Sequence, residues 1–252
     1  GVALATVLSQ CVSATLTVLC LTGSDGMCHL DIRRLRFYPE RFAQIMKIGL
    51  PAGMQSVIFN ISNVLIQSSI NSFGAVAVAG NTAAANVEGF VYISMNSLYQ
   101  TTLSFTSQNL DAKQYRRVDG ILVRCMILVI LIGVVLGQGA YRLGDPLLHI
   151  YSQDPEVIAY GARAMRYFCP FYFLLAIMNV LAGAVRGTGK SIPPMLILLF
   201  AMCIFRIFWI WLVVPLFPTI DGVYLLYPVS WVIGVVLMAL YTWKGKWMPK
   251  IE

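Results

Sequence analysis

The sequence is poor in charge and in the residues that catalyse reactions or bind metals. Only 12% of its 252 residues are charged, about half the fraction found in soluble domains. Too few charges remain to cover a water-facing exterior, which excludes an ordinary soluble domain. The two histidines, His29 and His149, lie in or near connections and form no recognisable ligand set, so we expect no metal site.

The cysteines and serines also lack the spacing of reactive sites. The six cysteines show no C-x-x-C motif, and most lie within apolar runs, which is typical of small buried thiols. No serine stands in the G-x-S-x-G motif of a nucleophile elbow. We therefore expect neither an enzyme nor a bound cofactor.

Long apolar runs make up most of the chain instead. Hydrophobic residues account for 58% of it, and the mean hydropathy is +0.75. A helix needs about 20 mostly apolar residues to cross the hydrocarbon core of a bilayer. Runs of this kind lie at 1–22, 45–72, 76–107, 120–142, 162–185, 192–214 and 223–243, two of them separated only by the turn Ser72-Phe73-Gly74. The sequence predicts an all-α, polytopic membrane helical bundle.

Lysine and arginine are concentrated in alternate connections between these runs. Basic connections lie at 31–47, 109–119, 186–191 and in the C-terminal tail, whereas 73–75, 143–156 and 215–222 contain no Lys or Arg. The positive-inside rule places the basic connections and the C-terminus in the cytoplasm, with Arg142, Arg163 and Arg166 as exceptions. The net charge of +7 then reflects topology, and its spread over several short turns argues against nucleic-acid binding.

One short stretch, GTGKS at 187–191, resembles the end of a phosphate-binding P-loop. The complete motif is Gly-x-x-x-x-Gly-Lys after a buried strand, whereas residue 184 is Ala and apolar spans flank the stretch on both sides. Pro193 and Pro194 fit the first turn of a following helix. We interpret the stretch as a tight turn with two basic anchors, and we expect no nucleotide binding.

Polar residues recur on one face of the 45–72 span. Ser56, Asn60, Asn63, Gln67 and Asn71 follow one another at intervals of 4, 3, 4 and 4 residues, which stacks them on one side of a helix. Exposure of such amides to lipid is unfavourable, because their hydrogen-bonding groups would have no partner there. They either bond to neighbouring helices or line a water-filled cavity, and the length of the stripe favours the cavity.

The next span carries Glu88, the only acidic residue inside an apolar run. Burial in a low dielectric favours the neutral form of a carboxyl group, as a proton relay requires, but a purely structural hydrogen bond is the alternative. Arg206 also lies mid-span and needs a partner from another helix, for packing or for function. The candidate cavity-lining residues are Asn60, Asn63, Gln67, Asn81, Glu88, Tyr92, Tyr172 and Asn179. Pro51, Pro170 and Pro228 predict kinked or broken helices, which together with polar stripes are typical of secondary transporters.

Several stretches resemble the C-terminal half of the multidrug and toxic compound extrusion (MATE) family. They are KIGLPAGMQS (47–56), INSFGAVAVAGNTAAANVEGF (70–90), SQNLDAKQYRRV (107–118), YSQDPEVIAYG (151–161), AGAVRGTGKSIPP (182–194) and YPVSW (227–231). The resemblance implies one of two six-helix bundles. Residues 1–22 would be the remnant of the sixth helix, 23–40 a cytoplasmic connection and 41–252 the second bundle, so we expect a fragment that lacks the first bundle.

The resemblance also implies export of cationic amphipathic small molecules, driven by an inward Na⁺ or H⁺ gradient, through alternating access between the two bundles. Some members of the family carry cation-binding carboxylates on the seventh and tenth helices, where this sequence has Phe59 and Leu175. Coupling would then rest on Glu88, on uncharged amides or on carboxylates in the missing bundle.

Two alternatives remain open at the level of sequence. A lipid-linked or polysaccharide-precursor flippase of the same superfamily would share the architecture, but it would be expected to carry several cationic residues in its cavity. A membrane structural subunit that transports nothing would have no wet cavity.

Overall fold

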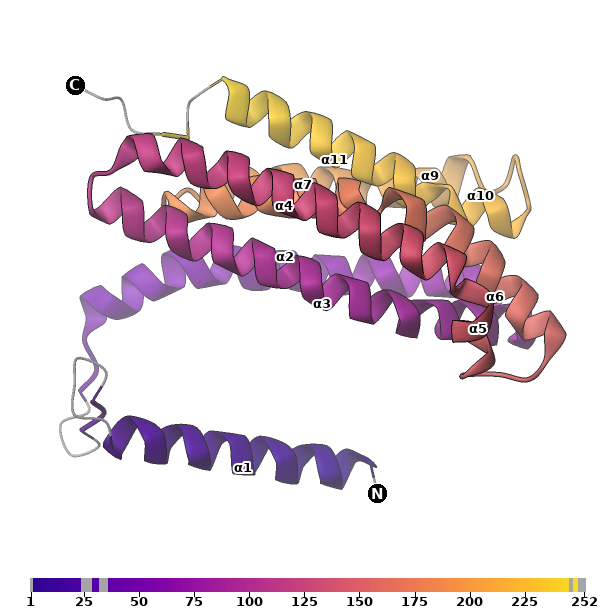
Figure 1. Ribbon diagram of the computed structural model, residues 1–252, viewed down its shortest axis with the longest axis horizontal. Coiled ribbons are helices and arrows are strands. Elements are labelled where there is room, and N and C mark those ends of the chain that lie inside the picture. Colours follow the sequence, from indigo (N-terminus) through magenta and orange to yellow (C-terminus); the bar gives the residue numbers. More distant parts are fainter. Residues whose placement is uncertain (1, 24–28, 32–35, 245–246, 249–252) are drawn as a thin grey trace. The chain divides into compact units, whose positions relative to one another are not determined.

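The computed structural model describes residues 2–23, 29–31, 36–244 and 247–248, and the regular elements in this part of the chain are all helical (Figure 1). The chain divides into two units, residues 1–47 and 48–252. Residues outside the described part include Cys28, Arg33, Arg34, Lys246 and Lys250.

The first unit contains α1 (Val2–Gly23) and the first residues of α2 (Pro39–Asn71). Three threonine hydroxyls of α1 are satisfied within the helix itself. The hydroxyls of Thr15, Thr17 and Thr22 donate to carbonyl oxygens four residues earlier at 2.8, 2.8 and 2.9 Å. Because these donors need no outside partner, α1 is compatible with an apolar environment along its length.

The second unit is a bundle of six consecutive helical spans. These are the remainder of α2; α3 (Ala75–Asp111); α4 (Tyr115–Arg142); α6 (Pro155–Phe168) with η2 (Cys169–Phe171) and α7 (Tyr172–Gly187); α8 (Ile192–Leu199) with η3 (Phe200–Ile204) and α9 (Phe205–Leu212); and α10 (Ile220–Tyr224) with α11 (Leu226–Trp243). A short helix, α5 (Gly144–His149), joins α4 to α6. This architecture confirms the predicted helical bundle.

In the part of the chain that the structure describes, five helical segments are long and apolar enough to cross a membrane. They lie at Leu4–Gly23, Tyr115–Arg142, Pro155–Gly187, Ile192–Leu212 and Ile220–Trp243. The helices α2 and α3, of 33 and 37 residues, are at least as long as these but contain the polar residues described above. The protein is therefore a multi-pass membrane protein.

Two of the three prolines that predict kinked or broken helices lie at a break. Pro170 lies in η2, a 3₁₀ turn that interrupts the span between α6 and α7. Pro228 lies in the first turn of α11, directly after the break at Leu225 that separates α10 from α11, whereas Pro51 lies inside the continuous α2. A π-helix, η3, interrupts the α8–α9 span without any proline, and this interruption was not predicted.

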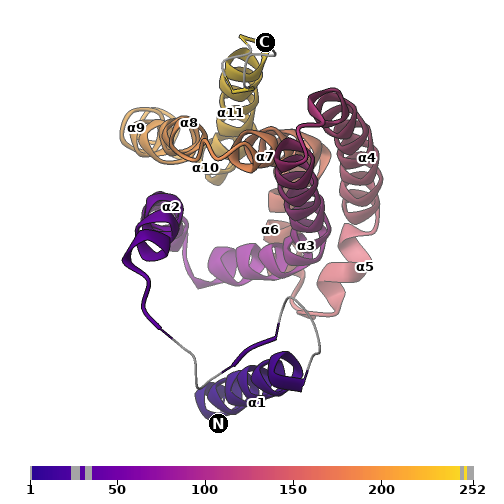
Figure 2. The same cartoon turned by 90° about the vertical axis from the view of Figure 1, so that its left-hand side faces the viewer.

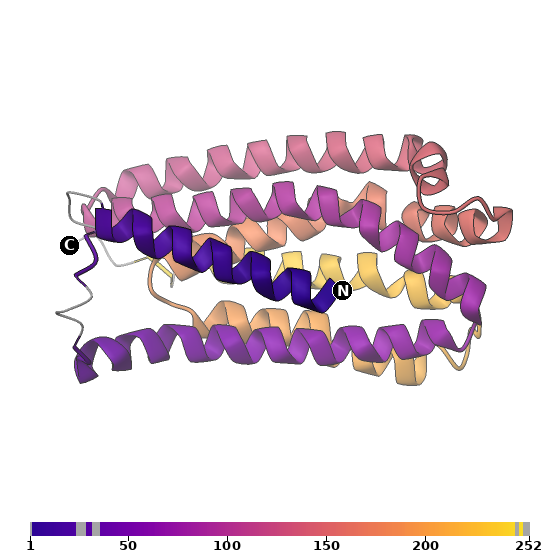
Figure 3. The same cartoon turned by 90° about the horizontal axis from the view of Figure 1, so that it is seen from below.

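The helix α3 is central to the packing of the second unit and contacts α4, α6 and α7. Figure 3 shows these long helices running in roughly the same direction. Small residues allow the closest approaches. At Gly133, a methyl group would lie 3.0 Å from the Phe173 Cα, and at Gly137 it would overlap the Cys169 carbonyl oxygen. These glycines place α4 directly against η2 and the start of α7.

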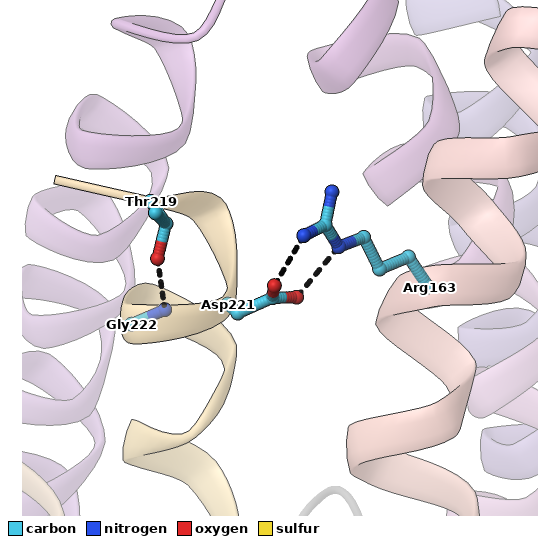
Figure 4. Close-up of polar contacts among 4 residues, drawn as sticks. All are labelled: Arg163, Thr219, Asp221 and Gly222. Atoms are coloured by element: carbon cyan, nitrogen blue, oxygen red, sulfur yellow. Dashed lines mark hydrogen bonds and ion pairs between the residues drawn. The ribbon is translucent and has the colours of Figure 1, made fainter. Parts of the chain in front are cut away.

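An ion pair joins α6 to α10. The Arg163 Nε donates to the Asp221 Oδ1 at 2.6 Å, and its Nη2 pairs with the Oδ2 of the same carboxylate (Figure 4). The backbone of α10 begins at Thr219, whose hydroxyl accepts from the Gly222 N–H at 3.4 Å. Arg163 was an exception to the pattern of basic connections, and the structure gives it an acidic partner 58 residues away.

Candidate functional site

A cavity of about 330 Å³ lies within the second unit, among α2, α3, α7, α8, η3, α9 and α11. In Figure 2, α2, α8 and α9 lie toward the left, α3 and α7 lie further to the right, and α11 lies at the top. Its lining residues are Ser56, Phe59, Asn60, Asn63, Glu88, Tyr92, Leu175, Met178, Asn179, Leu198, Met202, Arg206, Tyr227 and Trp231. The lining combines apolar and aromatic walls with a few polar groups, as ligand sites commonly do.

The polar stripe of α2 supplies one wall of this cavity. Ser56, Asn60 and Asn63 line it at successive turns of the helix. Ser62, on a neighbouring face, is buried, and its hydroxyl donates to the Met202 carbonyl oxygen of η3 at 3.0 Å. This bond sets the rotation of α2 relative to η3, so that the amides and not the aliphatic residues face the cavity.

Glu88 and Tyr92, one turn apart on α3, form the opposite wall. Two other groups act on the Glu88 carboxyl, the Tyr172 hydroxyl and the Arg206 guanidinium. The Tyr172 hydroxyl is close enough to interact with the carboxyl but does not reach the geometry of a hydrogen bond. The Tyr172 ring is buried against Trp231, with 5.5 Å between ring centroids. Glu88 is thus surrounded by polar and aromatic groups from other helices.

Five of the eight predicted residues line the cavity together: Asn60, Asn63, Glu88, Tyr92 and Asn179. Their role in binding stays a prediction.

The other three lie outside the lining. Gln67 donates from its Nε2 to the Asn71 Oδ1 at 3.0 Å, so these two stripe residues satisfy each other. Asn81 is buried almost two turns before Glu88, and Tyr172 lies behind the wall beside the Glu88 carboxyl. An even spacing along one helix face does not show how far along that helix the cavity extends before neighbouring helices close it.

Nine of the fourteen lining residues were not among the candidates, and for three of these nine the sequence carried a signal. Arg206 is a charged residue in the middle of the apolar run 192–214. Tyr227 and Trp231 are four residues apart in the stretch YPVSW, which resembles the MATE family. The Arg206 guanidinium lies over the Tyr227 ring, 4.9 Å from its centroid. This contact between α9 and α11 depends on tertiary packing, which spacing along the chain does not encode.

Phe59 and Leu175 also line the cavity. The resemblance implied that these positions hold cation-binding carboxylates in some relatives, and neither side chain here offers a ligand atom. Within the residues that the structure describes, no three His, Cys, Asp or Glu side chains form a group that could hold a metal ion. Glu88 is therefore the acidic group that the lining offers to a cation.

The GTGKS stretch lies away from this cavity, in the turn between α7 and α8. Gly189 adopts a φ of 81°, a backbone conformation that glycine tolerates best, and its N–H donates to the Arg186 carbonyl oxygen at 2.9 Å. The Nη1 of Arg186 donates to the Tyr99 hydroxyl at 2.9 Å. A helix, not a strand, precedes the turn, so the setting of a P-loop is missing here.

Comparison with known proteins assigns the chain to a family. The sequence model of the MatE family matches residues 51–212. The chain belongs to this family. A probable multidrug resistance protein NorM of Thermotoga maritima, similar to this MatE chain, is 28% identical over 201 residues, which are 78% of this chain and 42% of that protein. An FAD transporter of Shewanella oneidensis is 25% identical over 200 residues, which are 78% of this chain and 44% of that protein.

A solved structure supports the fold of this MatE lobe. An outward-facing multidrug resistance MATE family transporter of the MOP superfamily matches with a TM-score of 0.85 at 14% identity, over 96% of this chain and 55% of that chain. The chain spans about half the length of the relatives it matches. At this identity the structural likeness supports the MatE fold alone.

Cysteines introduced at Asn60 and Asn63 are expected to react with a membrane-impermeant methanethiosulfonate reagent about tenfold faster than a cysteine at Ser62, because the first two line the cavity and Ser62 is buried. Labelling rates in the intact transporter in vesicles measure this. Val64 is a matched control, since it is 67% exposed but lies outside the cavity lining, and lipid would shield it. Equal reactivity at Asn63 and Val64 would argue against a wet cavity.

Proposed function

We propose that the chain forms one lobe of a secondary transporter that exports organic cations across the bacterial inner membrane. The observation that carries the proposal is the cavity, which brings an acidic side chain and several amides together inside a bundle of membrane-spanning helices. Polar groups at this depth are costly unless they line a route for a polar solute. Membership of the MatE family and a relative named as a probable multidrug resistance protein support the same direction.

The proposed mechanism is antiport with alternating access. A second lobe, outside this chain, would face the cavity, and rocking of the two lobes would expose it to either side of the membrane in turn. An inward Na⁺ or H⁺ gradient would drive export, with Glu88 as the acidic group of this lobe that exchanges the coupling ion for the cationic substrate. The substrate would cross chemically unchanged, without a cofactor.

The proposed orientation places the basic connections and the C-terminus in the cytoplasm. The connection between α3 and α4 carries Lys113 next to the basic start of α4, and the turn between α7 and α8 carries Lys190. Lys and Arg are retained on the cytoplasmic side of inner-membrane proteins. Arg163 would lie on the non-cytoplasmic side, against the positive-inside rule, and its ion pair with Asp221 offsets its positive charge.

A flippase for lipid-linked precursors is the second candidate. A relative named as an FAD transporter supports substrates with phosphate groups among such proteins. Several cations would be expected to line a cavity for large anionic head groups, and the described lining holds one, Arg206. Cation export is therefore the better-supported proposal, and a structural subunit without transport gives no reason for Glu88 to lie in the lining.

The test uses the intact protein, including the part upstream of this chain, in inverted vesicles. An imposed Na⁺ or pH gradient is expected to drive accumulation of the cationic dye rhodamine 123, and an ionophore that collapses the gradient is expected to abolish it. The proposal fails if neither gradient moves the dye faster than in vesicles without the protein.

A further inference from the structure

Arg206 carries a positive charge into the interior of the second unit. It lies on α9 directly after the π-helix η3, lines the cavity and is only 3% exposed. An ionised group at membrane depth is costly to hold without partners. The contacts of this guanidinium therefore indicate which groups it can bind.

Two contacts from α11 fix the orientation of the guanidinium. Its Nε donates to the Ser230 Oγ at 3.1 Å, and that hydroxyl donates in turn to the Tyr227 carbonyl oxygen at 2.8 Å. One face of the guanidinium lies over the Tyr227 ring at 4.9 Å. The plane of the group and its Nε edge are thus occupied by the protein.

The opposite edge has no such partner. Within the described residues, neither terminal nitrogen of Arg206 donates to a protein acceptor, and neither is enclosed away from the cavity. Glu88 acts on the guanidinium electrostatically but forms no ion pair with it within 4.0 Å. The two charges lie apart in one cavity, with Asn60, Asn63 and Asn179 also in its lining.

We propose that the terminal nitrogens of Arg206 bind a carboxylate group of the transported molecule. A guanidinium offers two parallel N–H donors in a fixed fork that matches the two oxygens of a carboxylate. Glu88 would face the cationic part of the same molecule across the cavity. The inference rests on the proposed transport function and adds a preference, among its cationic substrates, for molecules that also carry a carboxylate.

A pair of dyes isolates the carboxylate. Rhodamine 110 has a free carboxylate, and rhodamine 123 is its methyl ester, so the two share one cationic ring system. Their dissociation constants are measured by fluorescence anisotropy on the intact transporter in nanodiscs, with empty nanodiscs as the baseline. The preference is the dissociation constant of rhodamine 123 divided by that of rhodamine 110.

The Arg206→Gln substitution is expected to lower this preference about tenfold, because a charge-assisted bond is lost for one dye only. Arg206→Lys keeps the charge but not the fork and is expected to retain part of the preference. Arg124→Gln is the matched control, since Arg124 is exposed on α4 and lies outside the lining. It is expected to leave the preference unchanged.

Three results would overturn the carboxylate site. They are an unchanged preference in Arg206→Gln, an equal loss of affinity for both dyes in Arg206→Gln and Arg206→Lys, and a wild-type protein that does not bind rhodamine 110. Binding is measured without a gradient, which separates this inference from the proposed function. An Arg206-dependent preference with no gradient-driven transport in vesicles would support the site and overturn the transport proposal.

Discussion

Replacing Glu88 by glutamine is expected to reduce gradient-driven movement of rhodamine 123 by about tenfold to a hundredfold. Glu88 is the acidic group in the described lining of the cavity, so the substitution removes the charge that would hold a cation and leaves Arg206 without a counter-charge. Both effects disfavour a cationic substrate and a cationic coupling ion. Initial rates in inverted vesicles, normalised to the amount of transporter, measure the change.

Two further variants control this experiment. Glu156→Gln makes the same change at an exposed position in the first turn of α6 and is expected to transport normally. The double variant Glu88→Gln/Arg206→Gln restores neutrality and is expected to bind cations better than Glu88→Gln alone. Unchanged coupling in Glu88→Gln would remove this residue from the mechanism and place coupling on the amides or outside this chain.

Among the glycines of α4, a methyl group added at Gly137 is expected to cause the largest loss of stability. The added Cβ would overlap the Cys169 carbonyl oxygen, which belongs to a backbone and cannot rotate away as a side chain could. Overpacking of this kind costs about 1–3 kcal/mol. We expect Gly137→Ala to lower the melting temperature of the detergent-solubilised protein by several degrees and to reduce its yield.

Gly139 provides the comparison on the same helix. A Cβ built at this residue meets nothing within 4 Å, so Gly139→Ala tests the change in helix propensity without the clash. Melting followed by size-exclusion chromatography distinguishes the two variants. If Gly137→Ala were as stable as Gly139→Ala, the close contact between α4 and η2 would be wrong.

The membrane-spanning segments could be predicted from the sequence because a lipid bilayer requires long apolar segments, which are visible directly as runs of apolar residues. Each predicted span corresponds to helical structure, with ends that differ by at most seven residues, and the turn at Ser72-Phe73-Gly74 lies where it was expected. The short elements were harder to predict. The 3₁₀ turn η2 has Pro170 as its signal, but the π-helix η3 contains no proline or glycine and depends on contacts such as the bond from Ser62 to Met202.

The candidate site was predictable in part, for a similar reason. The stripe spacing identified Asn60 and Asn63 because helical periodicity alone puts them on one face. It also included Gln67, which bonds to Asn71, because periodicity does not distinguish an amide that lines a cavity from one that pairs within its own helix. The surroundings of Arg206 come from α11, more than 20 residues away, and become visible only when the helices are packed.

The π-helix η3 also determines the direction, around the helix axis, in which the side chains after it in the span point. Each residue turns a helix by about 100°, and a π segment accommodates one more residue per hydrogen-bonded ring than an α-helix does. Arg206 is the second residue after η3 and lines the cavity, whereas its neighbour Ile207 is exposed. Arg206, the only cationic residue in the described lining, therefore reaches the cavity because of the helical rotation that η3 introduces as well as because of its residue type. In an uninterrupted α-helix the same arginine would point in a different direction from the helix axis.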